Sequence, residues 1–183
     1  SYVPGPSWPP LSHTMIALLP PLTVADPGAG EGTLSQLLAK TAHKVIAVDN
    51  APKMVEFGAQ LAKKHGFKNL EFRLGDIEEP PIEKSSIDLA IFSQALHHAI
   101  HPERALDAAQ RILKKGGRVV VLDLLSHRFE KARELYADHW LGFSEVELQQ
   151  WLEAAGFHDI EVTVVAREKV SPHFQTVFAT GLK

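Results

Sequence analysis

The sequence has no cysteine, so disulfides, zinc–thiolate sites and thiol nucleophiles are all excluded. It also lacks an excess of positive charge, because 22 Asp and Glu outnumber 19 Lys and Arg and leave a formal net charge of -3. Surfaces that bind nucleic acid are basic, so we expect no nucleic-acid partner for this segment alone. No apolar run approaches the roughly 18 residues that span a membrane, and no signal-peptide pattern is present. We therefore expect a cytoplasmic domain without a membrane partner.

The start of the chain is unusual, because Ser1 is its first residue and Met15 its first methionine. A lost tag explains this start, and so does an upstream segment that has been removed. Proline and glycine exclude a regular element in the first ten residues, and a short apolar helix is expected after them. We divide the chain into an N-terminal segment with this helix, residues 1–21, and one domain, residues 22–183. A domain of that size can bury a full core without metals.

Short runs rich in β-branched and apolar residues predict buried strands from residue 22 onward. These runs are residues 22–26, 44–49, 70–74, 87–93 and 118–125. Helices are predicted between them, and this alternation implies an α/β fold with a mostly parallel sheet covered by helices on both faces. Two further predicted strands, 160–167 and 174–182, have no helix between them. They predict a C-terminal antiparallel hairpin, which brings the sheet to seven strands.

Local signals predict the helix boundaries. A helix over residues 31–43 is expected after the first strand, and Asn50 is expected to cap the next helix. The pair Gly116-Gly117 is expected to end a helix over residues 102–115. A capping box that begins at Ser144 is expected to open the second of two helices after the fifth strand.

A glycine-rich loop, residues 26–32, follows the first predicted strand and leads into a helix. Glycine permits a tight turn and a close approach of a ligand to the backbone, and amides at the helix start are donors. Thr33 stands where a dinucleotide fingerprint requires a third glycine, and the Gly-Lys-Ser/Thr of a phosphate-binding loop is absent. Asp49 ends the second strand, where a carboxylate can accept both hydroxyls of a ribose but repels a 2′-phosphate. Alone, each feature also fits a plain turn or a helix cap; together they predict a nucleoside site.

Several segments resemble, in order and spacing, the motifs of the class I methyltransferase family over residues 11–183. These segments are VADPGAGEG, VIAVDNAPKMVEFG, LGDIEEPP, SIDLAIFSQALHH and LKKGGRVVVLDLL. The resemblance implies a Rossmann-like fold and S-adenosylmethionine as cofactor, with S-adenosylhomocysteine as product. The residues that it implies for cofactor binding are Asp26, Gly28, Ala29, Gly30, Asp49, Asn50, Met54, Gly75, Asp76, Ile77, Ser93, Gln94 and Ala95.

The resemblance also implies individual roles. Asp49 is expected to bind the ribose, Met54 and Ile77 to lie beside the adenine ring, and Asp76 to meet its edge. The residues that follow the fourth strand, Ser93 to Ala95, are expected to line the sulfonium end. The chain departs from the family at Pro27, which removes one amide donor from the loop.

More narrowly, YVPGPSW, HWLGFSEVELQQWLEAAGF and FQTVFATG resemble methyltransferase domains that bacteria fuse behind an ArsR-type winged helix. This resemblance implies an upstream DNA-binding domain and a homodimer. Pro6 stands where related chains often have Arg, which leaves open how a cofactor carboxylate would be held.

Methyl transfer from a sulfonium asks little of a protein beyond proximity and alignment, and a base is needed only if the acceptor loses a proton. His98 is the candidate for that base, because imidazole titrates near neutrality, although packing or capping explains a histidine there equally well. His97 and His101 have a spacing that suits a metal, but no carboxylate completes a set and we predict no metal site. Asp123 interrupts an apolar strand, so it either has a buried partner or lies at a solvated strand end.

Other side chains are candidates to cover an acceptor pocket, namely His127, His139 and Trp140, although Trp8, Trp140 and Trp151 fit a core role as well. The leading hypothesis is methyl transfer to a small-molecule acceptor. Arsenite methylation by cysteine thiolates is excluded because there is no cysteine. The alternative is a domain that senses S-adenosylmethionine or S-adenosylhomocysteine in a transcriptional regulator. A nicotinamide oxidoreductase is excluded by Thr33.

Overall fold

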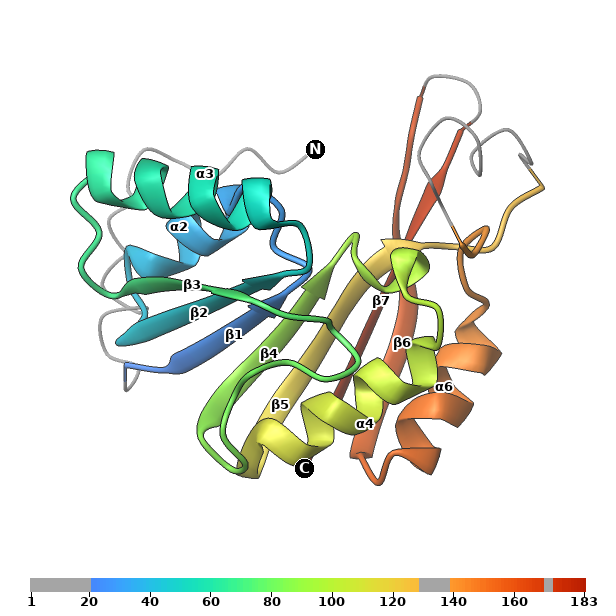
Figure 1. The fold of residues 1–183 in the computed structure, drawn as a ribbon. Coiled ribbons are helices and arrows are strands. Elements are labelled where there is room, and N and C mark those ends of the chain that lie inside the picture. Colours follow the sequence, from blue (N-terminus) through green and yellow to red (C-terminus); the bar gives the residue numbers. More distant parts are fainter. Residues whose placement is uncertain (1–20, 129–138, 170–172) are drawn as a thin grey trace, which may run out of the picture.

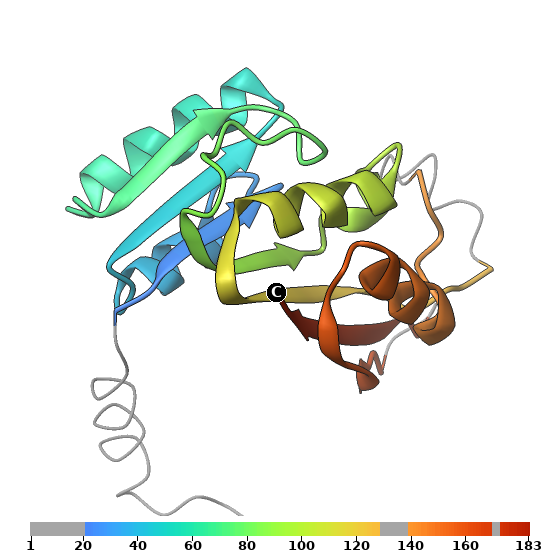
Figure 2. The same cartoon turned by 90° about the horizontal axis from the view of Figure 1, so that it is seen from below.

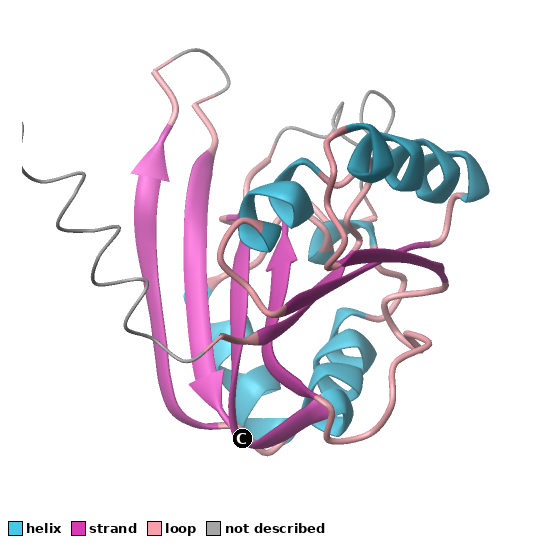
Figure 3. Cartoon of the chain, turned by 90° about the vertical axis from the view of Figure 1, so that its left-hand side faces the viewer, coloured by secondary structure: helices cyan, strands magenta, loops and turns pink. Residues whose placement is uncertain are grey.

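The computed structural model describes residues 21–128, 139–169 and 173–183. One seven-stranded sheet in the order β3-β2-β1-β4-β5-β7-β6 forms its centre (Figure 1). The strands are β1 (Thr23–Pro27), β2 (Lys44–Asp49), β3 (Leu70–Leu74), β4 (Ile87–Ser93), β5 (Leu113–Leu124), β6 (His158–Arg167) and β7 (Gln175–Leu182). The first five are parallel, whereas β7 runs antiparallel to both β5 and β6. The β6–β7 hairpin lies at one edge of the sheet, as predicted (Figure 3).

Helices cover both faces of this sheet. They are α2 (Thr33–Ala39), α3 (Pro52–Lys64), the short 3-10 helix η1 (Leu96–His98), α4 (Pro102–Ile112) and α6 (Glu145–Ala154). Successive strand residues point to opposite faces, so Val45 packs with Leu38 of α2 while Ile46 belongs to the cluster that contains Leu106 of α4. The helices α2 and α4 therefore lie on opposite sides of the sheet (Figure 2). This confirms the Rossmann-like α/β fold.

The predicted bounds of two helices are wrong. The helix predicted over residues 102–115 stops at Ile112, because Leu113 already pairs with Ile87 of β4 and is fully buried. The glycines at 116 and 117 therefore lie within β5 rather than ending a helix. Burial of a strand residue outweighs helix propensity here. The helix predicted over residues 31–43 is also shorter, since α2 covers only Thr33–Ala39.

The predicted cap of α3 is also wrong. Ala51, not Asn50, is the N-cap residue, and no side chain caps the helix. The Asp49 carboxylate accepts the Ala51 N–H instead (2.9 Å), so the preceding acid serves this end of the helix. In contrast, the predicted capping box of α6 is present, because Ser144 Oγ accepts from Glu147 N at 3.1 Å and the Glu147 carboxylate accepts from Ser144 N at 2.8 Å.

Several predictions fall outside the described residues. They concern the N-terminal segment up to residue 20, the helix expected near its end, and Trp8. Within the described ranges, no helix is long and apolar enough to cross a membrane.

Candidate active site at the carboxyl ends of the strands

A cleft of about 600 Å³ opens where β1, β2 and β4 end. In the sheet order, β1 lies between β2 and β4, so the chain winds in opposite directions from this point, and ligands of open α/β sheets bind at such a switch point. The residues that line the cleft are Gly28, Asp49, Asn50, Ala51, Met54, Asp76, Ile77, Glu78, Ala95, His98, Ala99, Ile100 and His139.

The cleft brings together most of the predicted site residues. Those that line it are Gly28, Asp49, Asn50, Met54, Asp76, Ile77, Ala95 and His98. Those that do not are Asp26, Ala29, Gly30, Gly75, Ser93 and Gln94. Sequence reasoning missed four lining residues, Ala51, Glu78, Ala99 and Ile100, and each of them adjoins a predicted residue or another missed one. Adjacency in the loops was the available signal, but only the folded backbone shows which neighbour faces the cleft.

The glycine loop turns tightly against two neighbouring strands. The N–H groups of Gly28 and Ala29 both donate to the Val48 carbonyl of β2, at 2.8 and 3.0 Å. Gly28 has a φ of +78°, and a Cβ at this position would lie 2.5 Å from the Cβ of Ala95. Only glycine therefore allows the loop to approach the end of β4 this closely.

Asp49 joins the loop to the start of α3. Its Oδ2 accepts from Gly30 N at 2.8 Å, and its Oδ1 accepts from Ala51 N at 2.9 Å. An ionised carboxylate has about four lone-pair sites, so about two remain for a ligand in the cleft.

Asp26 lies behind the loop rather than in the cleft. Its side chain is 2% exposed, and its Oδ2 accepts a hydrogen bond of 2.5 Å from Ser35 Oγ of α2. Burial raises the Asp26 pKa to about 6, and the nearby Asp49 adds to this, while the bond from Ser35 opposes it. The structure thus shows Asp26 holding α2 against β1, without contact to the cleft.

The loop after β3 is tied to both sides of the cleft. Gly75 N donates to the Asp49 carbonyl at 3.0 Å, and Asp76 Oδ1 accepts from Glu78 N at 2.8 Å. Glu78 Oε1 in turn accepts from His101 N at 2.7 Å, at the start of α4. The Asp76 carboxylate is therefore held by a backbone N–H of its own loop, and the Glu78 carboxylate by one at the start of α4.

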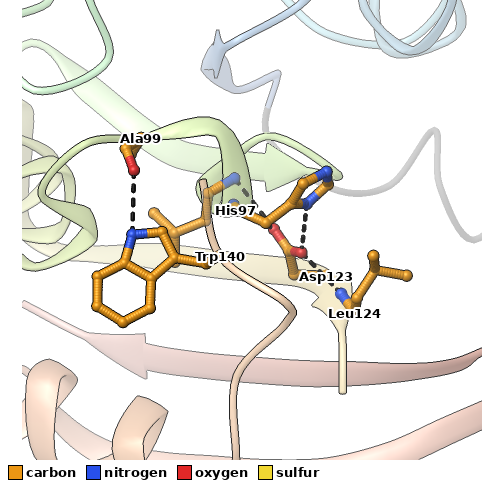
Figure 4. Close-up of polar contacts among 6 residues, drawn as sticks. His97, Ala99, Asp123, Leu124 and Trp140 are labelled. Carbon is orange, nitrogen blue, oxygen red and sulfur yellow. Dashed lines mark hydrogen bonds and ion pairs between the residues drawn. The ribbon is translucent and has the colours of Figure 1, made fainter. Parts of the chain in front are cut away.

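Asp123 has a buried partner and does not lie at a solvated strand end. It is fully buried, and its Oδ1 lies 2.6 Å from Nδ1 of His97, which is 5% exposed (Figure 4). His98 is exposed and lines the cleft, with its ring centroid 4.0 Å from that of His97. Within the described residues, no group of three His, Asp or Glu side chains could hold a metal ion.

The candidates for an acceptor pocket divide into two sets. His139 lines the cleft, whereas His127 and Trp140 do not. Trp140 packs edge-on against Trp151 of α6 and donates its indole N–H to the Ala99 carbonyl at 3.1 Å. It therefore supports the wall from behind, and Trp151 has the core role that the sequence left open.

Comparison with known proteins decides the family. The model of a family described as "Methyltransferase domain" matches residues 20–159. The chain belongs to this methyltransferase family. An arsenite methyltransferase of Halobacterium salinarum is 31% identical over 156 residues, which make up 80% of this chain and 40% of that relative. A demethylmenaquinone methyltransferase of Clavibacter sepedonicus is 28% identical over 164 residues, or 75% of this chain and 66% of the relative.

The chain thus spans 40% of the length of the first relative and 66% of the length of the second. Among solved structures, Bacillus subtilis YcgJ matches with a TM-score of 0.75 at 19% identity, covering 93% of this chain and 97% of that one. An S-adenosylmethionine-dependent methyltransferase from Aquifex aeolicus matches with a TM-score of 0.67 at 23% identity, covering 96% and 93%. At these identities the structural likeness shows the fold alone.

S-adenosylmethionine is the cofactor of this methyltransferase family, and the cleft fits it. The open lone pairs of Asp49 suit ribose hydroxyls, and the apolar side chains of Met54 and Ile77 border the same cleft. Gly28 and Ala95 also line the cleft, and a Cβ at Gly28 would lie 2.5 Å from that of Ala95, so glycine is needed for this part of the wall to form. The fit therefore rests on carboxylate oxygens that can accept from ribose hydroxyls and on apolar side chains in the same cleft.

Proposed function

We propose that this domain transfers the methyl group of S-adenosylmethionine to a small molecule whose nucleophilic atom carries a proton. The observation that carries the proposal is the joint placement of Gly28, Asp49 and His98 in one cleft at the strand ends. When bound, S-adenosylmethionine supplies a methyl group on a positively charged sulfur. The chain has to bind both molecules, align them and exclude water, which supplies most of the rate in such a transfer.

The binding residues divide the cleft into two ends. Asp49 accepts the ribose hydroxyls, Met54 and Ile77 enclose the adenine, and Asp76 accepts a hydrogen bond from its edge. Support comes from their shared position on the cleft wall and from the two oxygens of Asp49, which are already oriented by backbone amides. These amides hold the carboxylate in place before a ligand arrives.

The acceptor end is formed by His98, His139 and Ile100, which line the cleft beyond Ala95 along the chain. The transfer would form a bond from the acceptor's nitrogen or oxygen to the methyl carbon and break the carbon–sulfur bond, with S-adenosylhomocysteine leaving as a neutral thioether. An imidazole nitrogen of His98 would take the proton that the acceptor loses. The relatives named for arsenite and for demethylmenaquinone show that acceptors vary within the family. Without cysteine, this chain has no thiolate for arsenic, so we favour an organic acceptor.

Calorimetric titration with S-adenosylmethionine and S-adenosylhomocysteine tests the cofactor end. The wild type is expected to bind both ligands, and Asp49→Ala is expected to weaken binding at least about tenfold, because charge-assisted hydrogen bonds contribute about 1.5–3 kcal/mol. Asp107→Ala, which removes the same charge from an exposed position on α4, is the control and should bind like wild type. Unchanged affinity in Asp49→Ala, with an unchanged thermal melt, would refute the assigned site.

Transfer of a labelled methyl group to a metabolite extract tests the activity itself. Labelled product that disappears in His98→Ala supports the proposed acceptor end. Tight cofactor binding without any transfer would favour the sensing role predicted from the resemblance to ArsR-fused domains, and a winged-helix segment encoded ahead of Ser1 would favour it too. A cytoplasmic location and a homodimer stay predictions from the sequence.

A further inference from the structure

The buried carboxylate of Asp123 accepts hydrogen bonds from two separate elements. Its Oδ2 lies 3.0 Å from Leu96 N and 3.3 Å from His97 N of η1, and its Oδ1 lies 2.7 Å from Leu124 N of β5. The fourth contact, 2.6 Å to His97 Nδ1, completes the set (Figure 4). A carboxylate in an apolar core is costly unless it is bonded in this way. Asp123 therefore fastens η1 to the end of β5.

The same short helix also holds the segment on its other side. The His97 carbonyl accepts from His139 N at 3.1 Å and from Trp140 N at 3.0 Å, and the Ala99 carbonyl accepts from the Trp140 indole. Thus η1 is bonded to β5 through Asp123 and to the segment that carries His139 into the cleft. Both histidines of the acceptor end depend on this one attachment.

The ring of His97 also contacts His98 directly. The two ring centroids are 4.0 Å apart with an interplanar angle of 48°. The ring of His97 is held from the interior by Asp123, and it limits the directions that the exposed His98 ring can take. A continuous path of contacts thus runs from a buried acid, through a buried imidazole, to a side chain on the cleft wall.

We propose that Asp123 and His97 are positioning residues that fix the positions of the His98 and His139 side chains at the acceptor end of the cleft. This inference rests on the proposed function, in which His98 takes the proton of the acceptor. Neither positioning residue lines the cleft, so the role that we assign to them is exerted through the residues that do. Their loss should lower turnover through misalignment while cofactor binding at Asp49 persists.

The test combines kinetics with nitrogen NMR of the histidine rings in Asp123→Asn. Asparagine keeps only one acceptor oxygen, so it cannot accept both from the η1 N–H groups on one side and from Leu124 N on the other, and the contact set of η1, His97 and β5 should be broken on one side. We expect turnover to fall about 100-fold, as for a displacement of about 1 Å, with the Kd for S-adenosylhomocysteine changed less than about threefold. We also expect the ring signals of His98, assigned with His98→Ala, to move.

Asp88→Asn is the matched control. Asp88 lies at the other end of β4 and accepts from Thr23 N at 2.8 Å and from Lys114 Nζ at 3.0 Å, so it too bonds neighbouring elements. This variant should leave turnover and the His98 ring signals at wild-type values. Wild-type turnover and unmoved His98 signals in folded Asp123→Asn would overturn the proposal.

His97→Asn covers the case in which Asp123→Asn does not fold. Its amide keeps a donor near the position of Nδ1 for Asp123, but it removes the ring that contacts His98. The same loss of turnover and the same movement of the His98 signals are expected, and unmoved signals would overturn the proposal. If the wild type transfers no methyl group at all, the proposed function fails, while the NMR comparison still decides whether Asp123 and His97 position His98.

Discussion

Replacing Gly28 with alanine should destabilise the fold and distort the cleft, because the substitution adds a Cβ where there is no space for one. Gly28 has a φ of +78°, a left-handed conformation that is unfavourable for a residue with a side chain. The added Cβ would lie 2.5 Å from Ala95 Cβ and 3.6 Å from Ile77 Cγ2. Because Cβ atoms are the rigid part of a side chain, relief requires the loop and the end of β4 to separate.

The loss of stability in Gly28→Ala has two contributions, backbone strain and steric overlap. Left-handed strain costs about 1–2 kcal/mol, and overpacking in a closely packed region costs about 1–3 kcal/mol. The free energy of unfolding of Gly28→Ala should therefore fall by about 2–5 kcal/mol. Gly66→Ala separates the two terms, because Gly66 has nearly the same φ, +77°, but no heavy atom within 4 Å of the added Cβ. It should show only the strain term.

Urea unfolding followed by circular dichroism measures both variants, and calorimetry measures their affinity for S-adenosylhomocysteine. Gly28→Ala should unfold at a clearly lower urea concentration than Gly66→Ala and should bind the ligand more weakly than wild type. Gly66 lies outside the cleft, so its variant should keep wild-type affinity. Equal destabilisation by the two substitutions would refute the argument, because the contact with Ala95 would then contribute nothing.

Two further predictions concern residues outside the cleft. Burial raises the folded-state pKa of Asp26 to about 6, whereas the unfolded-state pKa is about 4. Asp26 therefore contributes fully to the stability of the folded state below about pH 4, where it is protonated in both states. This contribution is lost as the pH rises through about 6. Asp26→Asn should therefore gain about 3 kcal/mol relative to wild type between about pH 4 and about pH 7 in urea unfolding, and a constant difference would contradict this. Ser144→Ala removes the capping contact to Glu147 N and should cost about 1 kcal/mol in the same assay, whereas Ser86→Ala, at a half-buried loop position where the hydroxyl donates to the Glu83 carbonyl, should cost less.

The sequence motifs predicted which loops form the candidate site, but not which of their side chains face it. Gly28 and Asp49 were placed by a glycine turn after one strand and an acid at the end of the next, and both line the cleft. Asp26 belongs to the same motif, but it lies behind the loop with Ser35. A motif gives the order of residues along a turn. It does not tell which side chains point to the ligand and which point to the helix behind.

The surroundings of Asp123 could not be predicted from the sequence either. The sequence left two interpretations open, a solvated strand end or a buried partner, since the partner lies 26 residues away in the chain. The contact forms because β4 and β5 are neighbours and the chain turns into η1 directly after β4. The pairing of two distant strand ends is a property of the sheet, which no local pattern records.

The sequence by itself determined the class of fold and the family, because both depend on local signals. Buried strands read as β-branched runs, helices begin at capping residues, and a glycine turn needs glycine whatever surrounds it. Only the tertiary structure decided where α4 gives way to β5, that Asp26 is hidden, and that His98 and His139 share one wall with a buried acid behind them. These features depend on packing between elements far apart in the chain, and there burial free energy outweighs local preference.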